Sequence, residues 1–372
     1  MAGTSLQKRI AAFLGMASAA SGQFARAQDS WPCFRGSPGE SASVRMQFST
    51  RPRLVWTCEA GSGVESTAAI VGSSVYVGTN KSKVLALQLS DGAVRWTFKT
   101  EDSVAASPCV VDDVVYVGDE AGVFYAIDAG SGHLRWKIRT DSKIISSATP
   151  APGVVLVGSY DYTLYCLSRS SGRIRWKFRA DAQVHCSPCV VGDRVMIAGC
   201  DGMIRIISLR SGRQIAAAHE DTTIAASPAY SDGTVYVGAM NGQYLAVRIR
   251  DGSVRWKITR GDEDQGTTSS AAVSGDAVIF SNKGSQVFRA SASTGKVAWV
   301  FRTKEEVDSS PVIAGNTVFV GSGEGNLYAI GLSDGTALWH FAAGAEIKSS
   351  PAIAEGRLVI GTEDGAIYCF AG

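Results

Sequence analysis

The sequence has little proline, little net charge and few of the signatures that mark common enzymes. Its 372 residues include only 10 Pro against 41 Gly, which is typical of a globular chain with many tight turns. Its 36 Lys and Arg nearly balance 34 Asp and Glu, so it lacks the basic excess that would hold a nucleic acid. It contains no His-Glu-x-x-His, no Gly-x-Ser-x-Gly and no convincing catalytic triad.

The eight cysteines do not predict a disulfide pattern. An exported protein could form disulfides, but the spacing of these residues does not pair them. Cys186 and Cys189 form a Cys-x-x-Cys that we expect on a strand, where residues three apart lie about 10 Å apart on opposite faces. That separation is too large for a disulfide. We therefore expect most cysteines to fill small apolar positions.

Residues 1–27 are predicted to be a secretory signal. Lys8 and Arg9 form a short basic region, residues 10–20 are modestly apolar, and residues 25–27 (Ala-Arg-Ala) supply a small-x-small cleavage site. The apolar run is too short to span a bilayer, so no transmembrane segment is expected. No Cys follows the predicted cut, so a bacterial lipid anchor is not indicated. We expect an exported protein of the periplasm, the cell envelope or the extracellular space.

A repeat of about 40 residues organises the rest of the chain. The stretch from Ala126 to Trp136 reads as a strand end, a tight turn with Ser-Gly, and a new strand that carries a Trp. The spacing between equivalent positions is 40 residues, with a single step of 43, and Ala216 replaces Trp in one copy. The Trp residues at this position are Trp56, Trp96, Trp136, Trp176, Trp256, Trp299 and Trp339.

Each repeat predicts four short antiparallel strands, which make one blade of a β-propeller. Eight inner three-strand sets are expected to begin at a Ser, the first at Ser66 and the last at Ser350. The last set ends with the chain and lacks a fourth strand, whereas a surplus strand with Trp56 lies at residues 53–58. We therefore predict an all-β, eight-bladed propeller over residues 53–372, closed by the N-terminal strand that completes the last blade. Residues 28–52 are predicted to be an extended arm whose Trp and Phe lie against this body.

The repeat resembles that of the pyrroloquinoline-quinone (PQQ) β-propellers. The pattern Ala-x-Asp-x-x-Ser-Gly-x-x-x-Trp from Ala126 to Trp136 carries the resemblance over residues 53–372, and residues 31–36 (Trp-Pro-Cys-Phe-Arg-Gly) look like the opening of exported bacterial members. This family includes quinoprotein alcohol dehydrogenases and the non-enzymatic outer-membrane assembly factor BamB. In the dehydrogenases of this family, PQQ is held by two adjacent Cys and a stacking Trp, beside a calcium site. If this chain were such an enzyme, the resemblance would imply the same residues here. This sequence has no Cys-Cys pair, and Trp31 is the only Trp outside the repeat position.

The resemblance therefore favours a BamB-like, non-enzymatic scaffold that binds a protein or peptide of the cell envelope, with no cofactor. A quinoprotein oxidoreductase that uses PQQ and calcium is the alternative, and a small-ligand sensor at the channel mouth is the second alternative. Three acids at residues 262–264 lie in the 43-residue step and could hold Ca²⁺, although a solvated acidic loop is the simpler interpretation.

The candidate site is the mouth of the central channel. One repeat position, just before the inner strand of each blade, varies from blade to blade, and variable residues on a regular scaffold are typical of binding sites. Its polar members are the predicted partner- or ligand-binding residues, and we predict no metal ligands among them. They are Glu65, His185, Thr268, Asp308 and Lys348. A solvated cluster of salt bridges is the competing interpretation.

Overall fold

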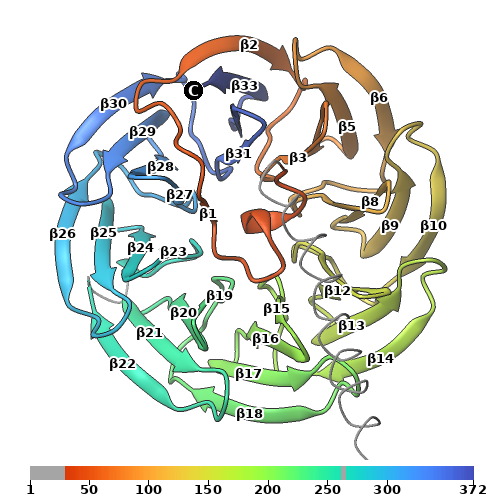
Figure 1. Ribbon diagram of the computed structural model, residues 1–372. Helices are drawn as coiled ribbons and strands as arrows, with labels where there is room; N and C mark the ends of the chain where they lie inside the picture. The colour runs from red at the N-terminus through yellow and green to blue at the C-terminus, as the bar shows by residue number, and fades with distance from the viewer. Residues whose placement is uncertain (1–29, 261–264) are drawn as a thin grey trace, which may run out of the picture.

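The computed structural model describes residues 30–260 and 265–372. Within them the strands form eight sheets arranged in a ring, as Figure 1 shows. The predicted all-β, eight-bladed propeller is therefore confirmed. The predicted signal peptide and the acidic run at 262–264 lie outside the described residues. No helix in the described part of the chain is long and apolar enough to cross a membrane.

The blades follow one another around the ring in sequence order. Blades 1 and 2 contain β3 (Ala69–Val71), β4 (Ser74–Thr79), β5 (Lys83–Gln88), β6 (Val94–Lys99), then β7 (Cys109–Val111), β8 (Val114–Gly118), β9 (Val123–Asp128) and β10 (Leu134–Arg139). Blades 3 and 4 contain β11 (Thr149–Ala151), β12 (Val154–Gly158), β13 (Thr163–Ser168), β14 (Ile174–Arg179), then β15 (Cys189–Val191), β16 (Arg194–Ala198), β17 (Met203–Ser208) and β18 (Gln214–His219). Blades 5 and 6 contain β19 (Ala229–Ser231), β20 (Thr234–Gly238), β21 (Gln243–Arg248), β22 (Val254–Thr259), then β23 (Ala272–Ser274), β24 (Ala277–Asn282), β25 (Gln286–Ser291) and β26 (Val297–Arg302). Blades 7 and 8 contain β27 (Val312–Ala314), β28 (Thr317–Gly321), β29 (Asn326–Gly331), β30 (Ala337–Ala342), then β31 (Ala352–Ala354), β32 (Arg357–Gly361), β33 (Ala366–Ala371) and β2 (Arg53–Glu59).

The N-terminal strand closes the ring. β2 pairs antiparallel with β33, in a register that matches Arg53 with Ala371 and Glu59 with Ala366. The last blade therefore takes its outer strand from the opposite end of the chain, as predicted, and that strand is one residue longer than expected. Closure in this way leaves no unpaired outer edge on β33.

The Trp residues of the outer strands hold neighbouring blades together. In six of the seven, all but Trp339, the indole Nε1 donates a hydrogen bond of 2.8–3.0 Å to a carbonyl in a turn of the next blade, as Trp136 does to Arg169. Gly172 lies under the Trp136 ring with φ +68°, and a Cβ there would come within 2.6 Å of the indole. The Ser-Gly of the repeat therefore provides both the left-handed turn and the space for the Trp of the preceding blade.

The N-terminal arm crosses the middle of the ring, which the sequence did not predict (Figure 1). It forms a short 3₁₀ turn, Phe34–Gly36, and the two-residue strand β1 (Ser43–Val44), which joins β27 as a parallel fifth strand of blade 7. Trp31 is buried and exchanges two backbone hydrogen bonds of 2.8 Å with Ile70.

One repeat position serves the arm in six blades. It is the middle residue of the inner strand, whose backbone N–H points to the channel and donates to a carbonyl of the arm. These donors are Ile70, Val110, Val190, Tyr230, Val273 and Ile313. In blade 3 the same position is Pro150, which has no N–H to donate. The arm thus pairs with the inner edges of most blades, which would otherwise be open.

Two details of the sequence interpretation are corrected. The inner strands begin two residues after the expected Ser in blades 2–8, and three residues after Ser66 in blade 1. In five blades the residue before the strand is the Pro of a Ser-Pro pair, which cannot donate to a ladder. In blade 1 the residue equivalent to Ser107 is Thr67, not Ser66. Cys186 likewise precedes β15, so only Cys189 of that pair lies on a strand.

Candidate functional site

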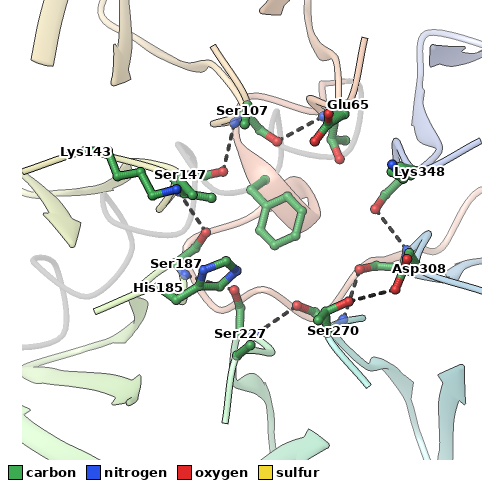
Figure 2. A pocket seen from close by; sticks show the side chains of 18 of the residues that line it. Glu65, Ser107, Lys143, Ser147, His185, Ser187, Ser227, Ser270, Asp308 and Lys348 are labelled. Carbon is green, nitrogen blue, oxygen red and sulfur yellow. Dashed lines mark hydrogen bonds between the residues drawn. The ribbon is translucent and has the colours of Figure 1, made fainter. Parts of the chain in front are cut away.

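The channel contains a polar cavity of about 370 Å³ that collects residues from all eight blades. All five predicted mouth residues line it, although their role in binding stays a prediction. The cavity is also lined by a Ser or Thr from every blade, by Glu120 and Lys143, and by Phe34 of the arm. Figure 2 shows these side chains converging on one space.

A ring of hydroxyl groups forms the wall of the cavity. The hydroxyl of Ser107 accepts a hydrogen bond of 2.9 Å from the backbone N–H of Thr67 in the preceding blade. Six further bonds of 2.9–3.1 Å repeat this contact, up to the bond from the N–H of Ser310 to the hydroxyl of Ser350. Each hydroxyl keeps its own proton, which remains free to donate to a molecule in the cavity. The serine hydroxyls therefore link neighbouring blades and also offer hydrogen-bond donors to the cavity.

One side of the mouth carries most of the charge (Figure 2). The carboxylate of Asp308 accepts a hydrogen bond of 2.9 Å from the Thr268 hydroxyl, which fixes its orientation. Lys348 lies 3.7 Å from Glu346 and 3.8 Å from Glu363, and these carboxylates, together with Glu65 and Asp308, outweigh its partial burial and raise its pKa. Lys348 is therefore a positive charge that several acids share.

The opposite side of the mouth is built around His185, which lies across from Glu65, Asp308 and Lys348 (Figure 2). The Tyr160 hydroxyl lies 2.6 Å from His185 Nδ1, and Lys143 Nζ lies 4.8 Å from the centre of the Tyr160 ring. Burial, reinforced by the charge of Lys143, lowers the pKa of His185, so the imidazole is neutral at pH 7. Lys143 is also 3.7 Å from Glu120, so it supplies the positive charge on this side.

The arm forms the floor of the cavity. The mouth residues precede the inner strands, whereas the arm bonds to the middle of these strands, so the arm lies deeper in the channel. Phe34 lines the cavity from below, and the adjacent Arg35 is buried, with its Nη2 donating to the carbonyls of Ala271 (2.8 Å) and Pro311 (2.6 Å). The arm thus closes the channel at this depth and leaves a pocket that is entered from the mouth.

Two side chains of the arm, Arg35 and Glu40, are both ionisable and buried. Burial lowers the pKa of Arg35 to about 9 and raises the pKa of Glu40, although Arg35 opposes the shift of Glu40. In the described residues neither carboxylate oxygen of Glu40 has a hydrogen-bond partner. Burial of these two groups destabilises the arm, which the backbone bonds to the inner strands and the packing of Trp31 hold in place.

Sequence reasoning missed the floor and the hydroxyl ring. The Ser residues were recognised as a repeat, but their contacts join neighbouring blades and do not follow from one repeat alone. Lys143 lies two residues before Ile145, the member of the variable ring in blade 3, and Glu120 lies in the turn after β8, so a comparison limited to the variable position passes over both. Phe34 had no signal, because nothing in the repeat says where the arm lies.

The acidic side of the mouth also gathers carboxylates that could together take a cation. One oxygen each from Glu306, Asp308 and Glu346 lie within 4.8 Å of one another. Exposed acidic groups often cluster without an ion, and nothing else in the described residues points to a metal here.

The closed ring of eight four-stranded blades, with its Trp contacts between blades, defines a PQQ-repeat β-propeller. The sequence pattern of the family described as outer membrane protein assembly factor BamB matches residues 43–153, 142–291 and 283–371. Since these matches cover most of the chain, the protein belongs to this family. A comparison with curated proteins found no match.

Solved structures agree on the fold and differ in what they do. BamB from Moraxella catarrhalis is 18% identical, with a TM-score of 0.77 over 86% of this chain and 100% of that chain. A computationally designed protein, Ika8, is 16% identical with the same TM-score and coverage. The quinohemoprotein alcohol dehydrogenase from Comamonas testosteroni is 14% identical, with a TM-score of 0.83 over 92% of this chain and 80% of that chain. At such identities the likeness concerns the fold alone.

Proposed function

We propose that the chain is an exported, non-enzymatic scaffold that binds a protein or peptide partner of the cell envelope at the channel mouth. The family supports this proposal, because its description names a factor in the assembly of outer membrane proteins. The observation that carries it is the pocket itself, which the arm closes below and which varied polar side chains line above. A regular ring does not need this variation, and rigid scaffolds commonly carry function at such variable positions.

The chemistry of the pocket suits part of a polypeptide. The floor at Phe34 is aromatic, the wall offers serine hydroxyls, and each side of the mouth carries a lysine next to acids. A protruding side chain or a short loop could meet all three kinds of group. Because the arm crosses the channel, a partner would insert from the mouth and would not thread through the ring.

Substitution of the mouth charges tests the proposal. We expect a variant with Glu65→Gln, Asp308→Asn and Lys348→Met to lose capture of the envelope partner by at least tenfold, since charge pairs within an interface are commonly worth more than about 1.5 kcal/mol. The measurement is affinity capture from envelope extract, with the melting temperature checked in parallel. Glu101→Gln is the matched control, because Glu101 is an exposed acid that pairs with Lys137 on an outer strand. Full capture by the triple variant would mean that another face binds the partner.

The fold likeness to an alcohol dehydrogenase favours a second candidate, a quinoprotein oxidoreductase that uses PQQ and calcium. The residues of the pocket do not fit that cofactor well. Among the described residues that line the pocket there is no Cys and no Trp, and the only aromatic carbocycle is that of Phe34. Six Trp residues of the repeat donate to carbonyls of the next blade, and Trp31 of the arm is buried against β3.

A spectral titration of the protein with PQQ and Ca²⁺ separates the two candidates. The scaffold proposal predicts no saturable change at high micromolar quinone. Binding of one equivalent would overturn it and would direct attention to alcohol substrates and a dye-linked assay.

A further inference from the structure

Two buried thiols face each other where the arm meets blade 2. Cys33 belongs to the arm and Cys109 is the first residue of β7, and both lie within one apolar cluster with exposed fractions of 2% and 0%. Their sequence neighbours share a backbone hydrogen bond, in which the N–H of Val110 donates to the carbonyl of Pro32 at 2.6 Å. The Cys109 thiol, together with burial, raises the pKa of Cys33, so the two side chains lie near each other.

This backbone contact sets a limit on how far apart the two residues can be. Standard bond lengths carry Cys33 Cα and Cys109 Cα to within about 8 Å of each other at most. A disulfide requires a Cα separation of roughly 4.4–6.8 Å and Cβ atoms that approach each other. The two side chains belong to the same apolar cluster and lie near each other, which agrees with the second condition. No other pair among the described cysteines has both a backbone bond between its neighbours and a thiol that raises the pKa of its partner.

From this geometry we infer that Cys33 and Cys109 are a disulfide site that fastens the arm covalently across the channel. The two thiols would be oxidised by thiol–disulfide exchange with a protein or small-molecule disulfide. One S–S bond forms between Cys33 and Cys109, the S–S bond of the oxidant breaks, and its two sulfurs leave as thiols with the two protons and two electrons. An oxidising compartment is required for the bond to persist.

The timing of the exchange follows from burial. Once the arm is docked, the neighbouring Cys109 thiol and burial raise the pKa of Cys33 far above its usual value, so the reactive thiolate is not available. Exchange must therefore begin while the arm is open, during folding or transient release. After closure, the same burial shields the bond from reducing thiols.

Peptide mapping of the full chain tests the inference. The protein is refolded with a mixture of oxidised and reduced glutathione, unfolded in the presence of an alkylating reagent, and digested without reduction. We expect one cross-linked pair that joins the peptides of Cys33 and Cys109, with the other six cysteines alkylated. Alkylation of Cys33 in the refolded protein, or its linkage to any other cysteine, would overturn the inference.

A second readout does not depend on how well a cysteine variant folds. Trypsin can cleave at the exposed Arg45, and the N-terminal fragment can leave only if the arm is not tied to blade 2. We expect the fragment to stay attached in the oxidised protein and to be released after reduction, and to be released from Cys33→Ala under both conditions. Cys166→Ala is the matched control, since Cys166 is equally buried in blade 3 and distant from the arm. Release of the fragment from the oxidised wild type would contradict the disulfide.

Discussion

Two buried polar residues of the arm, Glu40 and Arg35, lower the stability of the folded arm. The arm stays in place despite this, so its other contacts must hold it firmly. Glu40 is 1% exposed, and within the described residues its carboxylate has no hydrogen-bond partner and Arg35 uses only one of its terminal nitrogens. An unpaired buried polar group typically costs about 1–3 kcal/mol. The chain tolerates this cost because Trp31 and the backbone ladder hold the segment across the ring.

The raised pKa of Glu40 predicts that stability falls as pH rises. The folded protein favours the protonated carboxyl, whereas the unfolded chain loses the proton near pH 4.5. The stabilisation is therefore complete below about pH 4.5 and is lost as pH rises toward the folded pKa, by at most about 1.4 kcal/mol per pH unit. Arg35 does not contribute between pH 5 and 8, since it stays charged in both states below its folded pKa of about 9.

We expect Glu40→Gln to remove this dependence. The measurement is the melting temperature between pH 5 and pH 8, which should decline in the wild type and decline less in the variant. Glu59→Gln, at an exposed position of β2, is the control. Parallel pH profiles for wild type and Glu40→Gln would show that Glu40 is ionised in the folded arm.

The predictable part of the site was the part that the repeat encodes. Comparison of eight copies singled out Glu65, His185 and Asp308 because they vary where structure does not require it, and the structure brings them to one pocket. Phe34 and Glu40 could not be found in this way. They lie in a segment that occurs once, so no other copy shows what its residues contact.

Among the elements, the arm depends on the inner strands. Six of these strands donate a backbone N–H to it, and Pro150 shows that a blade keeps its form without this donor. The pattern of the sequence predicts the strands well, because Val-Tyr-Val-Gly alternation and Gly turns are local signals. It does not predict the ladder, in which four of the six bonds join residues more than 150 positions apart, as Pro38 and Val190 do.

Replacing one donor should loosen the arm without harming the blade. In Val190→Pro the N–H that bonds to Pro38 is gone, and the strand keeps the pairing that Pro150 tolerates in blade 3. Loss of one hydrogen bond of about 1 kcal/mol predicts about fivefold faster cleavage at Arg45 under limited trypsin digestion. Val190→Ala keeps the N–H and loses similar packing, so it is the control. Equal cleavage rates for the two variants would show that the ladder does not hold the arm.

At the scale of the whole molecule, closure of the ring joins the two ends of the repeat region. β2 supplies the fourth strand of blade 8 and brings Trp56, whose indole donates to Leu89 in blade 1. Counting inner and outer strands in the sequence was sufficient to predict this closure. The last blade lacks an outer strand and the N-terminus has one too many, so the simplest arrangement places the N-terminal strand in the last blade.

Deletion of residues 53–58 should therefore destabilise every blade together. The change exposes β33 and removes a buried Trp, which alone is worth about 3–5 kcal/mol, so we expect a drop in melting temperature of about 5 °C or more. Substitution of the exposed Leu54 and Val55 by Thr keeps the strand and serves as the control. An unchanged melting temperature after the deletion would contradict closure by β2.

The central claim is that a partner binds at the mouth of a channel that the arm closes. Site-specific photo-crosslinking in envelope extract tests it most directly, with a crosslinking amino acid at Ala225, which lines the mouth, and in parallel at Lys257 on the outer strand of blade 5. The account predicts one crosslinked protein from position 225 that is absent from position 257 and lost when Glu65, Asp308 and Lys348 are replaced. Crosslinking from position 257 alone, or from position 225 regardless of these replacements, would contradict it.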